Sequence, residues 1–206
     1  MTVSPPPRHG AGTVMDEIAE AARRLAEAGI ESPRVNAELI AAHVHGVSRA
    51  RLHAVPGAGS GTRFWEAVER RAAGEPLQHI TGRAYFRYLE LDVGPGVFVP
   101  RPETEAVAGW AIDWLQSSDG LERPGTVGAP AEDPVGDGVA GGPLAVDLGT
   151  GSGAIALAIA QEVPGARVHA VEAERLALAW AERNRARVPA GSAVTLHHTG
   201  LERALP

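Results

Sequence analysis

The feature that most constrains the fold is a regular alternation of strand and helix patterns in the later part of the chain. Short apolar runs at 144–149, 166–172 and 193–198 alternate with alanine-rich runs at 152–163 and 174–188. The short runs are typical of buried strands, and the longer runs are typical of helices. Because strands that alternate with helices form parallel sheets, this pattern predicts a doubly wound α/β fold.

A glycine-rich turn at 149–153 joins the first of these strands to the first helix. Its G-x-G-x-G spacing is a weak signal alone, and GAGSGT at 57–62 has the same spacing without a strand before it. Only the later turn follows a strand and opens a helix, where glycines allow a ligand to approach the backbone closely. Glu172, at the end of the next strand, can accept both hydroxyls of a ribose. We therefore expect an adenosine-containing ligand.

Two adenosine cofactors fit this arrangement, a nicotinamide dinucleotide and S-adenosylmethionine. Dinucleotide enzymes use the wider G-x-G-x-x-G spacing. Asp147, just before the turn, would pair with the ammonium of S-adenosylmethionine and would repel a pyrophosphate. We therefore favour S-adenosylmethionine and keep a nicotinamide-dependent oxidoreductase as an alternative. The expected cofactor-binding residues are Asp147, Gly149, Thr150, Gly151, Ser152, Gly153 and Glu172.

Composition excludes several other classes of protein. The chain has no cysteine and no lysine, which excludes disulfides, thiolate nucleophiles and a Walker-type phosphate loop. A formal net charge of -6 argues against direct nucleic-acid binding. No apolar run approaches the roughly 20 residues that span a bilayer, so we expect a cytoplasmic protein without a membrane partner. The pairs His43/His45 and His197/His198 point to different sides of their elements, so we expect no metal site.

The first part of the chain reads as a helical domain. We expect a disordered leader at 1–13 and a small helical domain at 14–80. Helical periodicity begins at Val14, a second helix is expected from Ser32-Pro33, and a third from an N-cap at Thr62. The second helix is predicted to carry one apolar face, formed by Leu39, Ile40, His43, Val44 and Val47.

Three further regions follow. Residues 81–116 predict a β-hairpin connector, with a turn at the GPG of 94–96, and then a helix that starts just after Pro102. Its tryptophans, Trp110 and Trp114, and Trp180 further on, are expected to be packing residues. The Gly- and Pro-rich stretch at 117–143 predicts a flexible loop. The strand–helix alternation then occupies 144–206.

Three segments, at 75–105, 146–160 and 166–172, resemble the peptide chain release factor N(5)-glutamine methyltransferases of the HemK/PrmC type. The first is the most specific, because GVFVPRPETE is not common to methyltransferases in general. The resemblance implies a helical domain that recognises the release factor, followed by a Rossmann-like methyltransferase domain that uses S-adenosylmethionine. It also implies methylation of the glutamine side-chain amide in the Gly-Gly-Gln motif of the release factor.

The resemblance assigns an active-site wall to the segment before the first of these methyltransferase strands. Its expected residues are Phe98, Pro100, Arg101, Pro102, Glu103 and Thr104. The prolines restrict the backbone, which suits a positioning role. The family's Asn-Pro-Pro-Tyr motif, which positions the amide, is absent, and Gly200 stands where relatives commonly carry an Asp. We therefore identify no catalytic residue and expect a C-terminally truncated member with an incomplete sheet of three strands; the alternative is a non-catalytic protein that binds the release factor, the cofactor or both.

Overall fold

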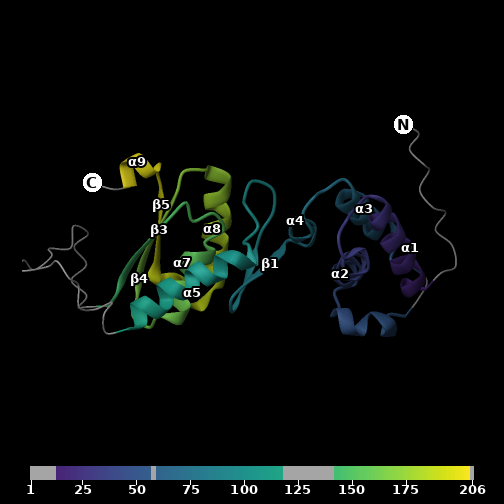
Figure 1. Ribbon diagram of the computed structural model, residues 1–206, viewed down its shortest axis with the longest axis horizontal. Coiled ribbons are helices and arrows are strands. Elements are labelled where there is room, and N and C mark those ends of the chain that lie inside the picture. The colour runs from purple at the N-terminus through teal and green to yellow at the C-terminus, as the bar shows by residue number, and fades with distance from the viewer. Residues whose placement is uncertain (1–12, 57–58, 118–141, 205–206) are drawn as a thin grey trace, which may run out of the picture. The chain divides into compact units, whose positions relative to one another are not determined.

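The computed structural model describes residues 13–56, 59–117 and 142–204 of the chain (Figure 1). The predicted leader and the predicted flexible loop lie almost entirely outside these ranges. The chain divides into two compact units, Met1–Gly82 and Arg83–Pro206. Within the described ranges, no helix is both long and apolar enough to cross a membrane.

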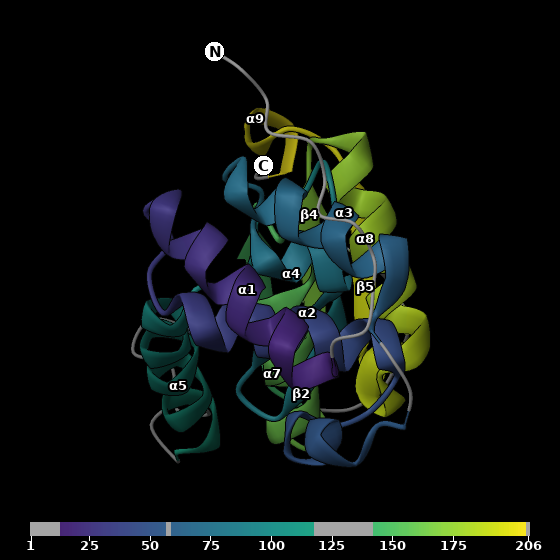
Figure 2. The same ribbon diagram turned by 90° about the vertical axis from the view of Figure 1, so that its right-hand side faces the viewer.

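The first unit is a helical bundle with its own core. Its elements are α1 (Val14–Glu27), α2 (Pro33–His45), η1 (Arg49–Ala54), α3 (Gly61–Ala72) and α4 (Leu77–Thr81). Helices α1, α2 and α3 pack against one another (Figure 2) and bury Ile18, Ile40 and Phe64 completely. Thr13 starts α1 with a capping box, in which Thr13 and Asp16 each accept a bond from the other's backbone amide.

Two local predictions for this unit are wrong, the first of them only in part. Ile40, Val44 and Val47 pack against the core as predicted, whereas Leu39 and His43 are exposed, because Ala37 and Ala41 complete the buried face. Thr62 is not the N-cap of the third helix, since α3 already begins at Gly61. The Ser60 amide donates to the Glu17 carboxylate of α1, and this long-range bond fixes where the helix begins.

A three-stranded parallel sheet forms the centre of the second unit (Figure 1). Its strands are β3 (Leu144–Leu148), β4 (Arg167–Glu172) and β5 (Val194–His198), in that spatial order, and the helices after them are α7 (Ala154–Glu162), α8 (Arg175–Arg187), η2 (Pro189–Ala193) and α9 (Leu201–Ala204). Helix α7 packs on the sheet through a core that includes Leu157, Val168 and Val194. The predicted fold class, a partial Rossmann-like α/β fold preceded by a helical domain, is confirmed.

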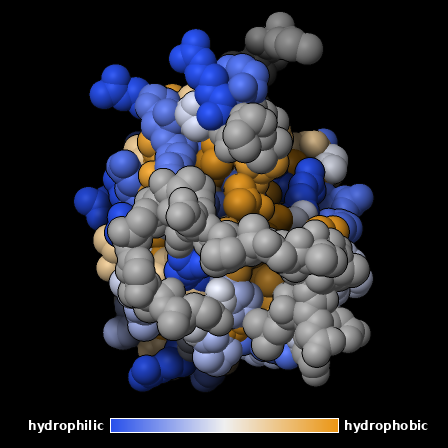
Figure 3. All heavy atoms as spheres, turned by 90° about the vertical axis from the view of Figure 1, so that its left-hand side faces the viewer, coloured by the Kyte–Doolittle hydropathy of each residue, from blue (hydrophilic) through white to orange (hydrophobic). Residues whose placement is uncertain are grey.

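The residues of β3 alternate between the two faces of the sheet. Asp147 is buried, whereas Leu144, Val146 and Leu148 point to the other side and are 40%, 51% and 43% exposed. Figure 3, which shows the face on the left-hand side of Figure 1, shows hydrophobic surface among polar side chains. One strand therefore carries a buried acid on one face and an apolar surface on the other.

An antiparallel hairpin precedes this sheet in the chain. Its strands are β1 (Arg83–Phe86) and β2 (Leu89–Asp92), and α5 (Pro102–Gln116) follows them. The hairpin itself turns at Arg87 and Tyr88. The predicted turn at Gly94–Gly96 is present after the second strand, where the Val97 amide donates to the Gly94 carbonyl at 3.3 Å. Both glycines are needed there, because a Cβ atom would clash with Trp180 or Leu176 of α8.

Candidate functional site

The glycine turn lies across the carboxyl ends of β3 and β4. The φ angles of Gly149, Gly151 and Gly153 are 78°, 59° and 85°, a region that other residues rarely adopt. The amides of Gly149 and Thr150 both donate to the Val171 carbonyl, at 2.9 Å each. The turn is therefore fixed to the end of β4 by its own backbone.

Asp147 is a buried carboxylate beneath this turn, with 9% of its surface exposed. Its Oδ2 accepts bonds from the Thr150 hydroxyl at 2.6 Å and from the Ala156 amide of α7 at 3.1 Å. Burial raises the pKa of Asp147, and the nearby Glu172 raises it further, while the two hydrogen bonds oppose the rise. A cation beside Asp147 would relieve the cost of keeping this group ionised.

Glu172 lies on the other side of the turn and is 8% exposed. Its Oε2 accepts a bond from the Gly151 amide at 2.8 Å, and its Oε1 accepts one from the Glu174 amide at 2.9 Å. A carboxylate has about four acceptor positions, so two hydroxyl groups could still bind. The structure thus brings together Asp147, the turn and Glu172 in one buried polar cluster, with Thr150 and Ser152 also buried.

Val97, the residue just before the expected active-site wall, lies beside this cluster. A Cβ atom on Gly151 would lie 3.9 Å from Cγ2 of the buried Val97. Next to it, the Phe98 side chain is 94% exposed. Arg101, Pro102 and Glu103 are exposed, while Pro100 and Thr104 are partly buried. Pro102 is the first residue of α5, where its missing amide hydrogen costs nothing.

Sequence reasoning missed two residues that hold this region together, Val97 and Asn184. Asn184 is 1% exposed and hydrogen-bonds the backbone of β2 and of the glycine turn. A signal for it was present in the sequence, because Asn184 continues the buried helical stripe of Ala177 and Ala181. A polar residue in such a stripe indicates a specific hydrogen-bonding role.

The prediction that the tryptophans are packing residues is wrong for two of the three. Trp110 and Trp114 are 70% and 44% exposed, because Ala108, Ile112 and Leu115 form the inner face of α5. Trp180 is partly buried, and its Nε1 donates to the Pro95 carbonyl at 3.2 Å.

The two adjacent histidines of β5 have separate partners. His197 stacks on His169, with ring centroids 5.1 Å apart, and His198 Nε2 lies 3.1 Å from the Ala173 carbonyl oxygen. Among the residues that the structure describes, no group of three or more side chains could hold a metal ion.

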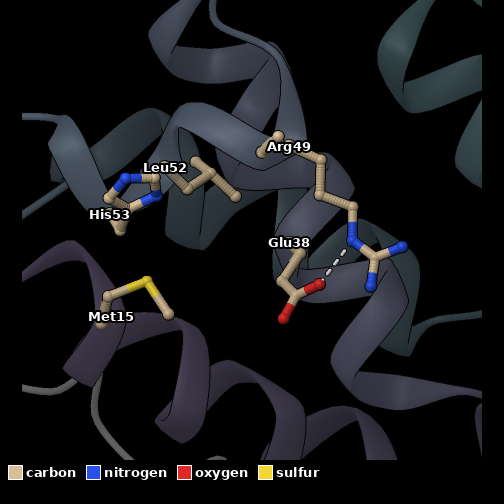
Figure 4. A pocket seen from close by; sticks show the side chains of 6 residues that line it. Met15, Glu38, Arg49, Leu52 and His53 are labelled. Atoms are coloured by element: carbon tan, nitrogen blue, oxygen red, sulfur yellow. Dashed lines mark hydrogen bonds and ion pairs between the residues drawn. The ribbon is translucent and has the colours of Figure 1, made fainter.

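A separate cavity of about 450 Å³ lies within the first unit (Figure 4). Its lining residues are Met15, Glu38, Arg49, Ala50, Leu52 and His53. Glu38 accepts bonds from Arg34 at 2.9 Å and from Arg49 at 2.5 Å, and the nearby arginines lower the pKa of Glu38. This cavity contains none of the residues that the sequence predicted for cofactor binding.

Comparisons with known proteins agree with the order of the two units along the chain. Residues 17–82 match the PrmC N-terminal domain, and residues 142–203 match the methyltransferase small domain. Over 171 residues, the chain is 57% identical to the release factor glutamine methyltransferase of Streptomyces coelicolor. The chain is similar to release factor glutamine methyltransferases over most of its length. The resemblance predicted from the sequence is thereby confirmed.

Other relatives with the same name are more distant. Those of Bifidobacterium longum and Mycolicibacterium smegmatis are 41% and 43% identical over 178 and 171 residues. The three matches cover 83%, 83% and 82% of this chain and 54%, 54% and 53% of the relatives. The chain therefore spans about half the length of the curated relatives it matches.

Proposed function

We propose that this chain binds S-adenosylmethionine and takes part in methylating the glutamine side-chain amide of the Gly-Gly-Gln motif in peptide chain release factors. The observation that carries the proposal is the pair of buried carboxylates, Asp147 and Glu172, on the two sides of the glycine turn. Two acids with no lysine in the chain suit a cationic cofactor and disfavour a pyrophosphate. The similarity to release factor glutamine methyltransferases supports the same assignment.

The residues of the cluster fit this cofactor group by group. Asp147 would hold the ammonium, because a neighbouring cation stabilises the ionised form of a carboxyl whose pKa burial has raised. Glu172 would hold the ribose hydroxyls with the acceptor positions that Gly151 and Glu174 leave over. The glycines at 149, 151 and 153 would let the cofactor lie against the backbone.

The cofactor, when bound, supplies an activated methyl group. The chain's own contribution would be to orient and shield it. Val97 closes one side of the turn, and the exposed Phe98 is placed to cover a ligand there. Pro100 and Pro102 limit the backbone freedom of this segment, which lowers the entropy lost on ordering it around a substrate. The sequence contains no Asn-Pro-Pro-Tyr segment, so we assign no catalytic residue within this chain.

The helical first unit would recognise the release factor as the protein substrate. The match to the PrmC N-terminal domain and the names of the relatives support this role. The place of action would be the cytoplasm, which agrees with a chain that contains no cysteine.

Calorimetric titration with S-adenosylhomocysteine and with NADH tests the cofactor. We expect S-adenosylhomocysteine to bind and NADH to give no heat of binding. Tight NADH binding without S-adenosylhomocysteine binding would instead support the nicotinamide-dependent alternative.

A second experiment tests the reaction, using purified release factor and cofactor labelled in the methyl group. Incorporation of label into the Gly-Gly-Gln peptide supports methyl transfer. Capture of the release factor without incorporation supports a binding protein that does not catalyse the reaction alone.

A further inference from the structure

We infer that Asn184 is a positioning residue that fixes the glycine turn relative to the segment carrying the expected active-site wall. The inference rests on the proposed function, because it concerns the same cofactor site. Asn184 lies on α8, is 1% exposed, and forms hydrogen bonds with backbone atoms of Asp92 and Ser152. It acts through the backbone of two other segments.

The side chain of Asn184 first binds the end of β2. Its Oδ1 accepts from the Asp92 amide at 2.7 Å, and its Nδ2 donates to the Asp92 carbonyl at 2.9 Å. These two bonds reproduce the pairing that a neighbouring strand would give. The residues from Val93 to the expected wall follow directly, so Asn184 fixes where that segment starts.

The third bond of Asn184 reaches the glycine turn. The other hydrogen of Nδ2 is positioned for the Ser152 carbonyl, at 2.9 Å. Ser152 precedes Gly153, the left-handed N-cap residue of α7. Because a peptide group is planar, holding the Ser152 carbonyl also fixes the direction of the Gly153 amide. That amide donates back to Thr150 at 2.9 Å, which closes the turn.

The distribution of buried polar side chains supports this role. In the second unit, the described residues bury five of them: Asp147, Thr150, Ser152, Glu172 and Asn184. The first four are in the expected cofactor set. A buried polar group is costly unless its hydrogen bonds are made, and Asn184 makes three. It is therefore joined to the same polar cluster as the expected site, through the Ser152 carbonyl.

The first unit supplies a matched control in Asn36, which is 9% exposed. Its Nδ2 donates to the carbonyls of Glu31 and Ser32, and its Oδ1 accepts from Arg71. Asn36→Ala and Asn184→Ala thus remove the same side chain, with two bonds to carbonyl groups and one accepted bond in each case. Only Asn184 is bonded to the glycine turn.

The test measures S-adenosylhomocysteine affinity and melting temperature of the full 206-residue chain. We expect Asn184→Ala to weaken binding about tenfold or more, since unmade buried bonds loosen the turn. Asn36→Ala should lower the melting temperature by a similar amount and leave the affinity within about twofold of wild type. Asn184→Asp keeps the acceptor for the Asp92 amide but loses the donor to Ser152, so it should also weaken binding. Wild-type affinity in both Asn184 variants would overturn the inference.

A measurement on the unchanged protein covers the case in which these variants do not fold. The side-chain amide resonances of Asn184 should shift on addition of S-adenosylhomocysteine, while those of Asn36 stay in place. If the ligand binds and the Asn184 resonances do not move, the inference is wrong. If the wild-type chain does not bind S-adenosylhomocysteine at all, the proposed function is wrong. This outcome differs from the one in which the ligand binds but Asn184 has no effect.

Discussion

The two units of this chain bury polar side chains for different purposes. In the described part of the first unit, Asn36 is the buried polar side chain, and it joins the start of α2 to α3. In the second unit, five such side chains gather around one turn. Buried polar and charged groups reduce stability unless they are paired. In the described residues, most of these groups lie at the expected ligand site, and the helical bundle contains one of them.

The largest expected effect is a loss of cofactor affinity when the charge of Asp147, in the second unit, is removed. Asp147→Asn keeps acceptors for Thr150 and Ala156 but removes the negative charge beside the expected ammonium. We expect cofactor affinity to fall by about 2–5 kcal/mol, the usual cost of removing one partner of a buried charge pair. Glu38→Gln in the first unit should leave affinity unchanged. Calorimetric titration of both variants measures these affinities. Equal losses of affinity in the two variants would contradict the expected difference between the units.

A comparable effect on stability is expected from two arginine–glutamate pairs, one in each unit. Arg87 binds Glu162 through two bonds of 2.6 Å, and the two side chains are 19% and 15% exposed. Arg70 and Glu75 form a similar pair in the first unit, but are 49% and 27% exposed.

We expect Arg87→Met to lower the free energy of unfolding by about 2 kcal/mol, because it leaves the partly buried Glu162 carboxylate without its hydrogen-bond partner. Arg70→Met should cost about 0.5 kcal/mol, since water screens the exposed pair. Urea denaturation measures both. A larger loss for Arg70→Met would show that exposure does not set the difference.

The pH dependence of stability sharpens the comparison further. The pKa of Asp147 is raised in the folded state, so ionisation of this group is easier in the unfolded chain. The contribution of Asp147 to the free energy of unfolding is therefore most favourable below pH 3.8, the ordinary pKa of an aspartate. This contribution is lost as the pH rises through the raised pKa of the folded state. We expect Asp147→Asn to gain stability relative to wild type as the pH rises over this window. Denaturation curves from acid to neutral pH test this, and a constant difference would contradict it.

The smallest expected effect concerns Gly109, in the middle of α5. A Cβ atom there would lie 2.9 Å from the Arg87 guanidinium, which also donates to the Glu105 carbonyl at 3.3 Å. Replacing glycine by alanine inside a helix usually gains up to about 1 kcal/mol. We expect Gly109→Ala to give little or no gain in wild type and the full gain together with Arg87→Met. Equal gains in both backgrounds, measured by thermal denaturation, would show that Arg87 does not select glycine.

The strand–helix alternation and the glycine turn could be predicted because each depends on local sequence. Strands β3 to β5 and helices α7 and α8 lie within one or two residues of their predicted ranges. The hairpin turn could not be found in this way, since Arg87 and Tyr88 are not typical turn residues. Arg87 holds a φ of 51° there because Glu162, 75 positions later, fixes its side chain.

The expected cofactor residues could be proposed from order along the chain, because the ends of neighbouring parallel strands meet at one edge. Their hydrogen-bond partners were not predictable, since the contacts of Glu172 with Gly151 and of Asn184 with Asp92 depend on how separate elements pack. The exposure of Trp110 and Trp114 likewise follows from which face of α5 meets α7.

The alternation along β3 has a consequence for how this region can vary. Asp147 faces α7, while its neighbours Val146 and Leu148 face the other way. Deleting one residue from the strand would exchange the two faces and carry the acid out of the site. The length of β3 therefore cannot change by a single residue without moving the acid to the opposite side of the sheet.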